Sequence, residues 1–444
     1  MEDPRLSRMY AALLARRFAE LRRSTWHLVV MRSGLLTMIV LTIVLVALAF
    51  GWRAHRLGQF AKLKSELKRG SVPQTPAAAR PGGQDAIVLQ RAQLSSSTAP
   101  EFLSATMLPG RGMNVLQISA YLPQKGEVQL LASPPLVEAA RLLDGSGMDA
   151  AGGGSLTMGA AFEAPWANRI SGVASPEGMT ATMTWRGRIL SLPAALREHG
   201  SGAMATGGLL LKRGADEVRT NVMPDGGEGQ ATFNAGDFDG HWISRTEITT
   251  SVQLSSRAME IKVVARNIGD TPEPMGIGWH PRFAILSGNR GQATLRLPNA
   301  LRAEVRDRRS GLPSGKLLPV TGTEYDFTGR AGAQLGGLSL DDSFVHLRPA
   351  LLDSGPIAEL RDPESNYGLR ITAISSTIKA IRVYAPADSN FVSIEPQFNY
   401  DDPFGHEWAK EEDTGMVVLQ PGQSVQWMVR LEIFSLTSDR SQRF

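Results

Sequence analysis

The chain has 444 residues, of which 42% are hydrophobic and 20% charged, a composition that excludes an intrinsically disordered protein. A formal net charge of +4 and the lack of any basic domain argue against a nucleic-acid partner. Cysteine is absent and the seven histidines show no pair at metal-ligand spacing, so we expect neither disulfides nor a metal site.

The N-terminal segment, residues 1–32, is rich in arginine. Arginines and apolar residues recur at helical spacing over residues 4–30, which predicts a basic amphipathic helix at a membrane surface. The alternative is a solvated helix that leads into the next segment.

Residues 33–52 are 20 residues without a charged side chain, and their middle is almost wholly aliphatic. A helix of this length spans a hydrocarbon core of about 30 Å, so we predict a transmembrane helix. Ala47-Leu48-Ala49 also resembles a signal-peptide cleavage site, but the 32-residue leader is long for such a peptide, which favours an uncleaved anchor.

The orientation of this span is nearly balanced by charge. Seven arginines precede it, and six basic residues follow between Arg53 and Arg69. We predict a single-pass inner-membrane protein whose larger C-terminal part lies outside the cytoplasm, in the periplasm.

Residues 53–84 form a charged stalk that ends in a linker rich in proline, glycine and alanine. A soluble domain is predicted for residues 85–437, followed by a short tail, 438–444. Within this domain, short runs of β-branched and apolar residues alternate with turn-forming clusters, and no fixed-length repeat is visible. The runs predicted as strands are 86–89, 114–122, 127–132, 247–254, 259–266, 293–297, 369–374, 380–384, 416–419 and 425–433. We therefore predict a mainly β fold, a large antiparallel β-sandwich.

Two residues of this domain have settings that suggest acid–base chemistry. His280 lies between Trp279 and Pro281, and the proline biases it towards an extended conformation. Glu395 is embedded in an apolar strand just before Pro396, where burial would raise its pKa and make it a better base near neutral pH. The alternative for His280 is a histidine that simply closes a strand.

Three further places bear polar residues in suggestive settings. They are Arg169 after Asn168, His199 before a glycine, and the acidic residues at 341–342. The simplest interpretations are a surface ion-pair arginine, an exposed loop histidine and turn-capping carboxylates.

The order of these motifs resembles the aldose 1-epimerase (galactose mutarotase-like) family over residues 86–434. The stretches that carry the resemblance are ANRISG, EHG, GIGWHPRF, LPSGKLLPVTGTEYDF, LDDSF and FVSIEPQFNYDDPFG. The resemblance implies the large β-sandwich of that family, termed a supersandwich. It also implies that His280 is the general acid and Glu395 the general base. Arg169, His199 and Asp341 would then bind sugar hydroxyls, with Asp341 preferred over Asp342 because Phe344 follows it at the family's spacing.

This chemistry suits the residue types. Interconverting the anomers of an aldose removes the proton of the C1 hydroxyl, protonates the ring oxygen, opens the hemiacetal and closes it on the other face. One acid and one base suffice, so we expect no cofactor.

The sequence also departs from the family pattern. The usual tyrosine after His-Pro is Arg282, and the usual asparagine before it is Trp279. Arg282 either binds the carboxylate or phosphate of an acidic sugar, since guanidinium binds oxyanions in a bidentate way, or is a solvent-facing arginine at the rim.

Two functions of different class remain open from the sequence. The first is a membrane-anchored mutarotase acting on an aldose or a saccharide end. The second is a non-catalytic carbohydrate-binding or assembly module on the same fold, tethered to envelope polysaccharide machinery.

Overall fold

The computed structural model describes Trp52 and residues 79–94, 98–194, 196–197 and 202–437. Contacts divide the chain into two units, Met1–Ala77 and Ala78–Phe444, and all the described strands belong to the second. The predicted amphipathic segment, the predicted transmembrane helix apart from Trp52, and nearly all of the predicted stalk lie outside the described residues. Within those residues, no helix is both long and apolar enough to cross a membrane.

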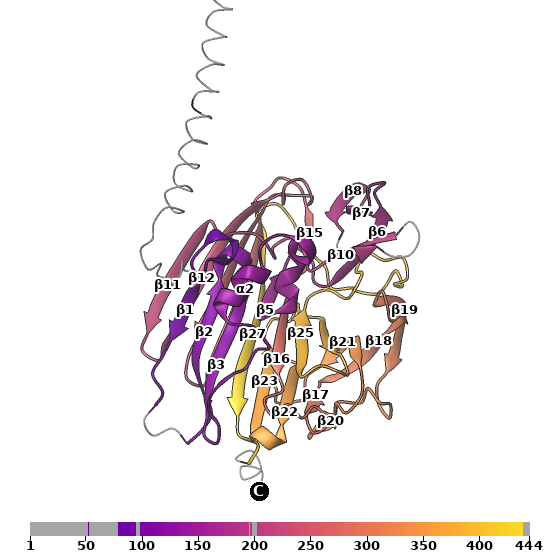
Figure 1. Ribbon diagram of the computed structural model, residues 1–444. Coiled ribbons are helices and arrows are strands. Elements are labelled where there is room, and N and C mark those ends of the chain that lie inside the picture. Colours follow the sequence, from indigo (N-terminus) through magenta and orange to yellow (C-terminus); the bar gives the residue numbers. More distant parts are fainter. Residues whose placement is uncertain (1–51, 53–78, 95–97, 195, 198–201, 438–444) are drawn as a thin grey trace, which may run out of the picture. The chain divides into compact units, whose positions relative to one another are not determined.

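The first large sheet carries the candidate site. Across the described strands it is antiparallel in the order β1-β2-β3-β5-β16-β25-β24-β21-β18-β19, with β4 paired to β3. Figure 1 shows these strands across the front of the domain. Their bounds are β1 Ile87–Gln90, β2 Glu101–Leu108, β3 Asn114–Leu122, β4 Gly126–Gln129, β5 Ala160–Glu163, β16 Gly278–Ala284, β18 Asn299–Asp307, β19 Leu312–Pro319, β21 Leu340–Arg348, β24 Ala380–Ala385 and β25 Phe391–Gln397.

The second large sheet packs against the first. Its order is β11-β12-β13-β14-β27-β23-β22-β17-β20. The bounds are β11 Glu217–Met223, β12 Gly226–Gly236, β13 Thr246–Leu254, β14 Ala258–Asn267, β17 Thr294–Arg296, β20 Ala333–Gln334, β22 Ile357–Asp362, β23 Tyr367–Ala373 and β27 Ser424–Phe434. Alternate residues of β14 are buried, as expected for a sheet with one face on a core. Trp427 of β27 donates from its indole to the Pro396 carbonyl of β25, which joins the two layers.

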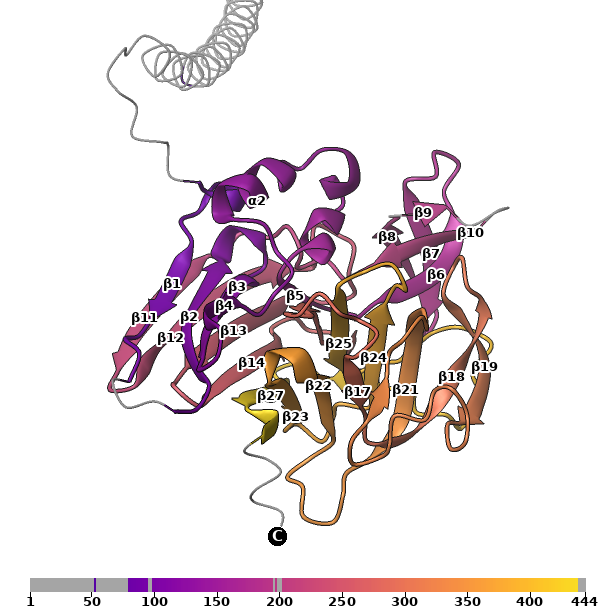
Figure 2. The same ribbon diagram turned by 60° about the horizontal axis from the view of Figure 1, so that its bottom comes forward.

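Smaller elements border these layers. A five-stranded sheet, β8-β7-β6-β10-β9, lies beside the first sheet (Figure 2). The short strands β15 and β26 pair with each other. Their bounds are β6 Arg169–Ala174, β7 Thr180–Trp185, β8 Arg188–Pro193, β9 Leu196–Arg197, β10 Gly202–Thr206, β15 Glu273–Met275 and β26 Val417–Leu419. The helical elements described within residues 79–437 are α2 Leu136–Leu142 and the 3₁₀ turns η1 Pro81–Gly83, η2 Pro109–Arg111, η3 Gly147–Asp149, η4 Gly153–Thr157 and η5 Pro363–Ser365.

The prediction of a mainly β, antiparallel sandwich is confirmed. Each of the ten predicted strands overlaps an observed one, from 114–122, which coincides with β3, to 127–132, which extends beyond β4. The sequence interpretation missed α2 and the five-stranded sheet. The strands of that sheet are short and its outer surface is exposed, so it lacks a strong alternation of apolar residues.

Candidate active site

Strand register brings His280 and Glu395 to the same face of the first sheet. β16 and β25 pair Gly278 with Gln397 and Arg282 with Ser393, so His280 lies opposite Glu395. β24 then places Arg382 opposite Glu395. Residues directly opposite one another in an antiparallel pair project to the same side, so the three side chains form one row across three strands.

Glu395 is completely buried and held by two neighbours. The Arg382 guanidinium donates from Nη1 to both carboxylate oxygens, at 3.0 Å to Oε1 and 2.9 Å to Oε2. Nδ1 of His280 lies 3.1 Å from Oε1. Burial by itself raises the pKa of Glu395, but the charges of Arg382 and His280 outweigh burial and lower that pKa below its ordinary value. The carboxylate is therefore ionised at neutral pH, as a base must be.

His280 has a nitrogen available for a ligand. Its side chain is 9% exposed, and its Nδ1 contact with Glu395 is not aligned as a hydrogen bond. Nε2 is buried and finds no hydrogen-bond partner in the described part of the chain. A buried polar atom without a partner is costly, so a ligand oxygen at this position would be stabilising.

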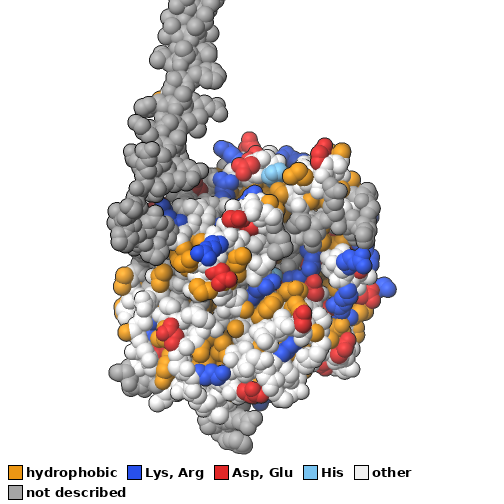
Figure 3. Space-filling view, viewed as in Figure 1, with side chains coloured by type: hydrophobic (Ala, Val, Ile, Leu, Met, Phe, Trp, Pro, Cys, Tyr) orange, Lys and Arg blue, Asp and Glu red, His pale blue; other side chains and the backbone are white. Residues whose placement is uncertain are grey.

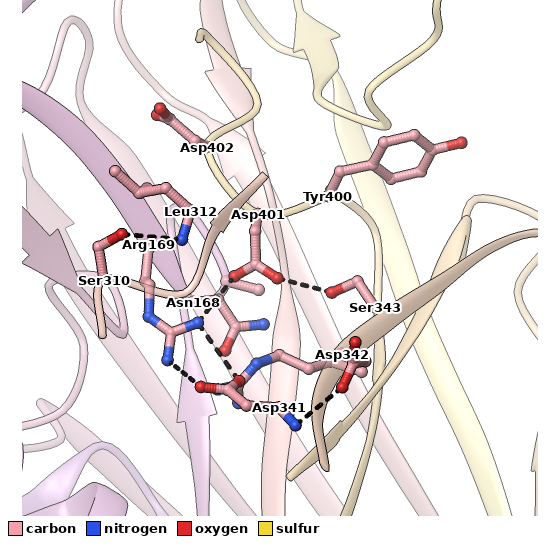
Figure 4. Close-up of polar contacts among 12 residues, drawn as sticks. Asn168, Arg169, Ser310, Leu312, Asp341, Asp342, Ser343, Tyr400, Asp401 and Asp402 are labelled. Carbon is pink, nitrogen blue, oxygen red and sulfur yellow. Dashed lines mark hydrogen bonds and ion pairs between the residues drawn. The ribbon is translucent and has the colours of Figure 1, made fainter. Parts of the chain in front are cut away.

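Arg169, at the start of β6, lies between two aspartates (Figure 4). Its Nη2 donates to Asp341 Oδ2 at 2.8 Å, and its Nη1 lies 3.6 Å from Asp401 Oδ1. Ser343 donates to the other oxygen of Asp401 at 2.6 Å. These contacts fix the orientation of the guanidinium and leave Asp341, whose side chain is 24% exposed, within reach of a ligand.

Asp341 also accepts a hydrogen bond from Nη2 of Arg382, which links it to the row of His280 and Glu395. Burial raises the pKa of Asp341, but Arg382 and Arg169 outweigh it and hold that pKa well below its usual range. The neighbouring Asp342 instead pairs with Arg302 and Arg308, each through a 2.7–2.8 Å contact. Of the two acidic residues, Asp341 is the one that joins the site.

The structure thus brings together four of the six residues selected from the sequence: His280, Glu395, Arg169 and Asp341. Arg282 lies on the same face, two residues beyond His280. His199 lies outside the described residues.

Two residues of the site were missed from the sequence, Arg382 and Glu163. Arg382 interrupts an apolar strand just as Glu395 does, and a pair of opposite charges in neighbouring apolar strands would have indicated it. Glu163 ends β5 opposite Gly278 and is buried, with Oε1 lacking a partner among the described residues. Burial and the nearby Glu395 raise the pKa of Glu163 to about 7, against the opposing effects of His280 and Arg382.

The surface over these strands carries basic side chains among acidic and apolar ones. Figure 3 shows Lys and Arg side chains beside a recess near the middle of the face, bordered below by apolar side chains. No cluster of His, Cys, Asp or Glu within the described ranges is arranged to hold a metal ion. The arrangement offers an ionised base, a histidine with a free nitrogen, and anchored groups that can bind hydroxyls.

An antiparallel two-sheet sandwich of this kind is the architecture of galactose mutarotase-like proteins. A galactose mutarotase-like protein from Clostridium acetobutylicum has 16% sequence identity and a TM-score of 0.61, over 79% of this chain and 99% of that one. A putative aldose 1-epimerase from Escherichia coli K12 has 15% identity and a TM-score of 0.56, over 79% and 100%. A GalM/aldose epimerase homologue from C. elegans has 18% identity and a TM-score of 0.55, over 75% and 95%.

The family model for aldose 1-epimerase matches residues 138–432, about two thirds of the chain. The chain belongs to the aldose 1-epimerase family. No curated protein matches it.

Proposed function

We propose that this protein is a mutarotase that interconverts the α and β anomers of an aldose or of a saccharide's reducing end. The observation that carries the proposal is the pairing of His280 with an ionised, buried Glu395 at 3.1 Å, while Nε2 of the histidine has no partner among the described residues. The family and its fold support the same reaction class.

In the proposed mechanism, Glu395 accepts the proton of the C1 hydroxyl and His280 donates a proton to the ring oxygen. The hemiacetal opens, the C1–C2 bond rotates, and the ring closes on the other face with the two proton transfers reversed. General acid and general base each contribute about 10²–10⁴-fold to such a reaction. Arg169 and Asp341 bind sugar hydroxyls from their fixed positions.

Glu395 has no exposed surface in the free protein. The sugar must therefore displace a neighbouring side chain to bring its C1 hydroxyl to the carboxylate. His280 is the neighbour that contacts Glu395 and has some exposed surface, and its unpartnered Nε2 is available to the ring oxygen.

The test is anomer exchange measured by NMR saturation transfer between the two anomeric proton signals, using the full chain purified in detergent. We expect exchange faster than in buffer for at least one sugar in a panel of neutral and acidic aldoses. A panel that shows no acceleration at all would refute the proposal.

A non-catalytic carbohydrate-binding module is the second candidate. The contact of Arg382 Nη1 with both oxygens of Glu395 favours it, because a base engaged by a guanidinium is less available to a sugar hydroxyl. Calorimetry decides between the two: glycan binding that persists in Glu395→Gln, without anomer exchange in the wild type, would establish the module.

The membrane anchor, the periplasmic location and an association with envelope polysaccharide machinery are proposals that rest on the N-terminal sequence. A C-terminal reporter fusion that is active only outside the cytoplasm tests the orientation. Activity of a cytoplasm-specific reporter would reverse it.

A further inference from the structure

Arg282 lies next to His280 on the same face of the first sheet. Alternate residues of a strand share a face, and β16 places Arg282 opposite Ser393 just as it places His280 opposite Glu395. β24 continues this second row with Tyr384, the cross-strand partner of Ser393. Arg282, Ser393 and Tyr384 therefore form a second row across the three strands, two residues along each strand from the row of His280, Glu395 and Arg382.

The Arg282 guanidinium is fixed by aromatic rings. Its central carbon lies 4.4 Å from the centroid of the Phe391 ring and 5.9 Å from that of Tyr384. The two rings are 6.0 Å apart and tilted, so they form a platform beneath the charge. Such stacking holds an arginine in place without using its hydrogen-bond donors.

One of those donors is buried without an acceptor. Nε of Arg282 is buried and has no hydrogen-bond partner among the described residues, and the same holds for the hydroxyl of Ser393, whose side chain is fully buried opposite it. Arg282 also forms no ion pair with any carboxylate in that part of the chain, whereas Arg169 and Arg382 each pair with Asp341. Arg282 and Ser393 are cross-strand partners, so the two unsatisfied donors project to the same side of the sheet, where an oxyanion would satisfy them.

We propose that Arg282 binds an anionic group on C6 of the aldose, so that the substrates are hexuronic acids or hexose 6-phosphates. This inference rests on the proposed function, because the position of His280 at the ring oxygen sets the position of the sugar. Burial lowers the pKa of Arg282, which shows that its charge is incompletely compensated in the free protein.

The bonding of the sugar ring accounts for the separation between His280 and Arg282 along β16. The ring oxygen is bonded to C1 and to C5, and C6 is the exocyclic carbon on C5. A sugar whose ring oxygen faces His280 therefore directs its C6 substituent away from C1. Arg282 lies two residues along the strand, at about 7 Å, and its long side chain covers the distance to a carboxylate or a phosphate.

The test compares charged and neutral sugars in one assay. Anomer exchange and calorimetric binding are measured with glucose, glucuronate and glucose 6-phosphate, for the wild type, Arg282→Gln and Arg186→Gln. Arg186 is the matched control, since its guanidinium also stacks on an aromatic ring, 4.7 Å from the centroid of Trp185, outside the site.

We expect the wild type to prefer one or both anionic sugars to glucose, and the larger preference tells carboxylate from phosphate. Arg282→Gln should reduce the charged-to-neutral ratio of kcat/KM about 10- to 100-fold, whereas Arg186→Gln should leave the ratio unchanged. An equal or better response to glucose, or an unchanged ratio in Arg282→Gln, would overturn the inference.

Binding keeps this inference separate from the mutarotase proposal. If no sugar shows anomer exchange, the mutarotase proposal fails. Calorimetric binding of an anionic sugar that Arg282→Gln weakens would still establish the anion site, and equal binding by both proteins would refute it.

Discussion

Two buried glutamates on opposite sheets, Glu395 and Glu359, have different surroundings although both are fully buried and contact arginine. Glu359 of β22 accepts from three guanidinium groups: Arg361 Nε at 2.9 Å, Arg370 Nε at 2.9 Å and Arg296 Nη1 at 3.3 Å. Every one of these contacts is a charge-assisted hydrogen bond, and together they occupy both carboxylate oxygens.

Glu395 has one arginine and a histidine. Nε2 of that histidine and Nε of the nearby Arg282 have no hydrogen-bond partner among the described residues. The comparison teaches that a buried carboxylate alone does not indicate function. An unsatisfied donor beside it does not suffice either, since Nε of Arg296 in the Glu359 cluster also lacks a partner among the described residues. What distinguishes Glu395 is the histidine next to it, because an imidazole can exchange a proton near neutral pH and a guanidinium cannot.

The largest effect is expected on the rate of anomer exchange when the histidine beside Glu395 is replaced. His280→Asn should reduce the rate of anomer exchange about 10²–10⁴-fold, because the acid is lost while the amide fills a similar volume. The measurement is NMR saturation transfer, with the unfolding midpoint as control. A variant with the wild-type rate would remove His280 from the mechanism.

Glu359→Gln should act on stability instead. It leaves three arginines without a counter-charge and should lower the free energy of unfolding by about 3–5 kcal/mol. Urea denaturation measures the loss. If the variant is as stable as the wild type, the Glu359 cluster is not the structural counterpart that the contacts indicate.

Glu273 extends the comparison to a buried carboxylate with no arginine partner in the described residues. Burial raises its pKa to about 7, against a hydrogen bond from Thr246 at 2.7 Å. The folded state therefore binds this proton more tightly than the unfolded state. Its contribution to stability is complete below the ordinary pKa of 4.5 and is lost as the pH rises towards 7, by about 3 kcal/mol.

Glu163, whose pKa is also raised to about 7, makes the stability of the fold depend on pH in the same direction. The Glu273→Gln variant therefore separates the contribution of Glu273 from that of Glu163. Its stability should fall less than that of the wild type between pH 5 and pH 8, measured by urea denaturation at both values. Parallel losses in the two proteins would show that Glu273 titrates normally.

Arg382→Gln tests what distinguishes Glu395 from Glu273 and Glu163. Without the guanidinium, burial dominates and the pKa of Glu395 should rise, as the pKa values of the other two buried glutamates do. The acid limb of kcat/KM should then move to higher pH, because the base is needed in its ionised form. An unmoved limb would mean that Arg382 does not set the charge of Glu395.

Much of the fold could be predicted from the sequence, since alternating apolar residues mark strands such as β14 and β27. His280 and Glu395 could be singled out because each is a polar residue in an apolar strand next to proline. Their contact could not, because it depends on the register between β16 and β25, more than 100 residues apart.

Arg382 shows the limit most clearly. It lies in a predicted strand, yet nothing local says whether its side chain faces solvent or Glu395, since a shift of one residue in register would reverse the face. The same ambiguity applied to Arg282, for which the sequence left a substrate contact and a rim position equally open.

The most direct test of the account is the rate of anomer exchange per folded molecule in Glu395→Gln and Glu359→Gln, measured side by side at pH 7. If Glu395 is the base, the rate falls about 10²–10⁴-fold in Glu395→Gln and stays at the wild-type value in the folded fraction of Glu359→Gln. Exchange that survives in Glu395→Gln, or falls equally in both, would contradict it.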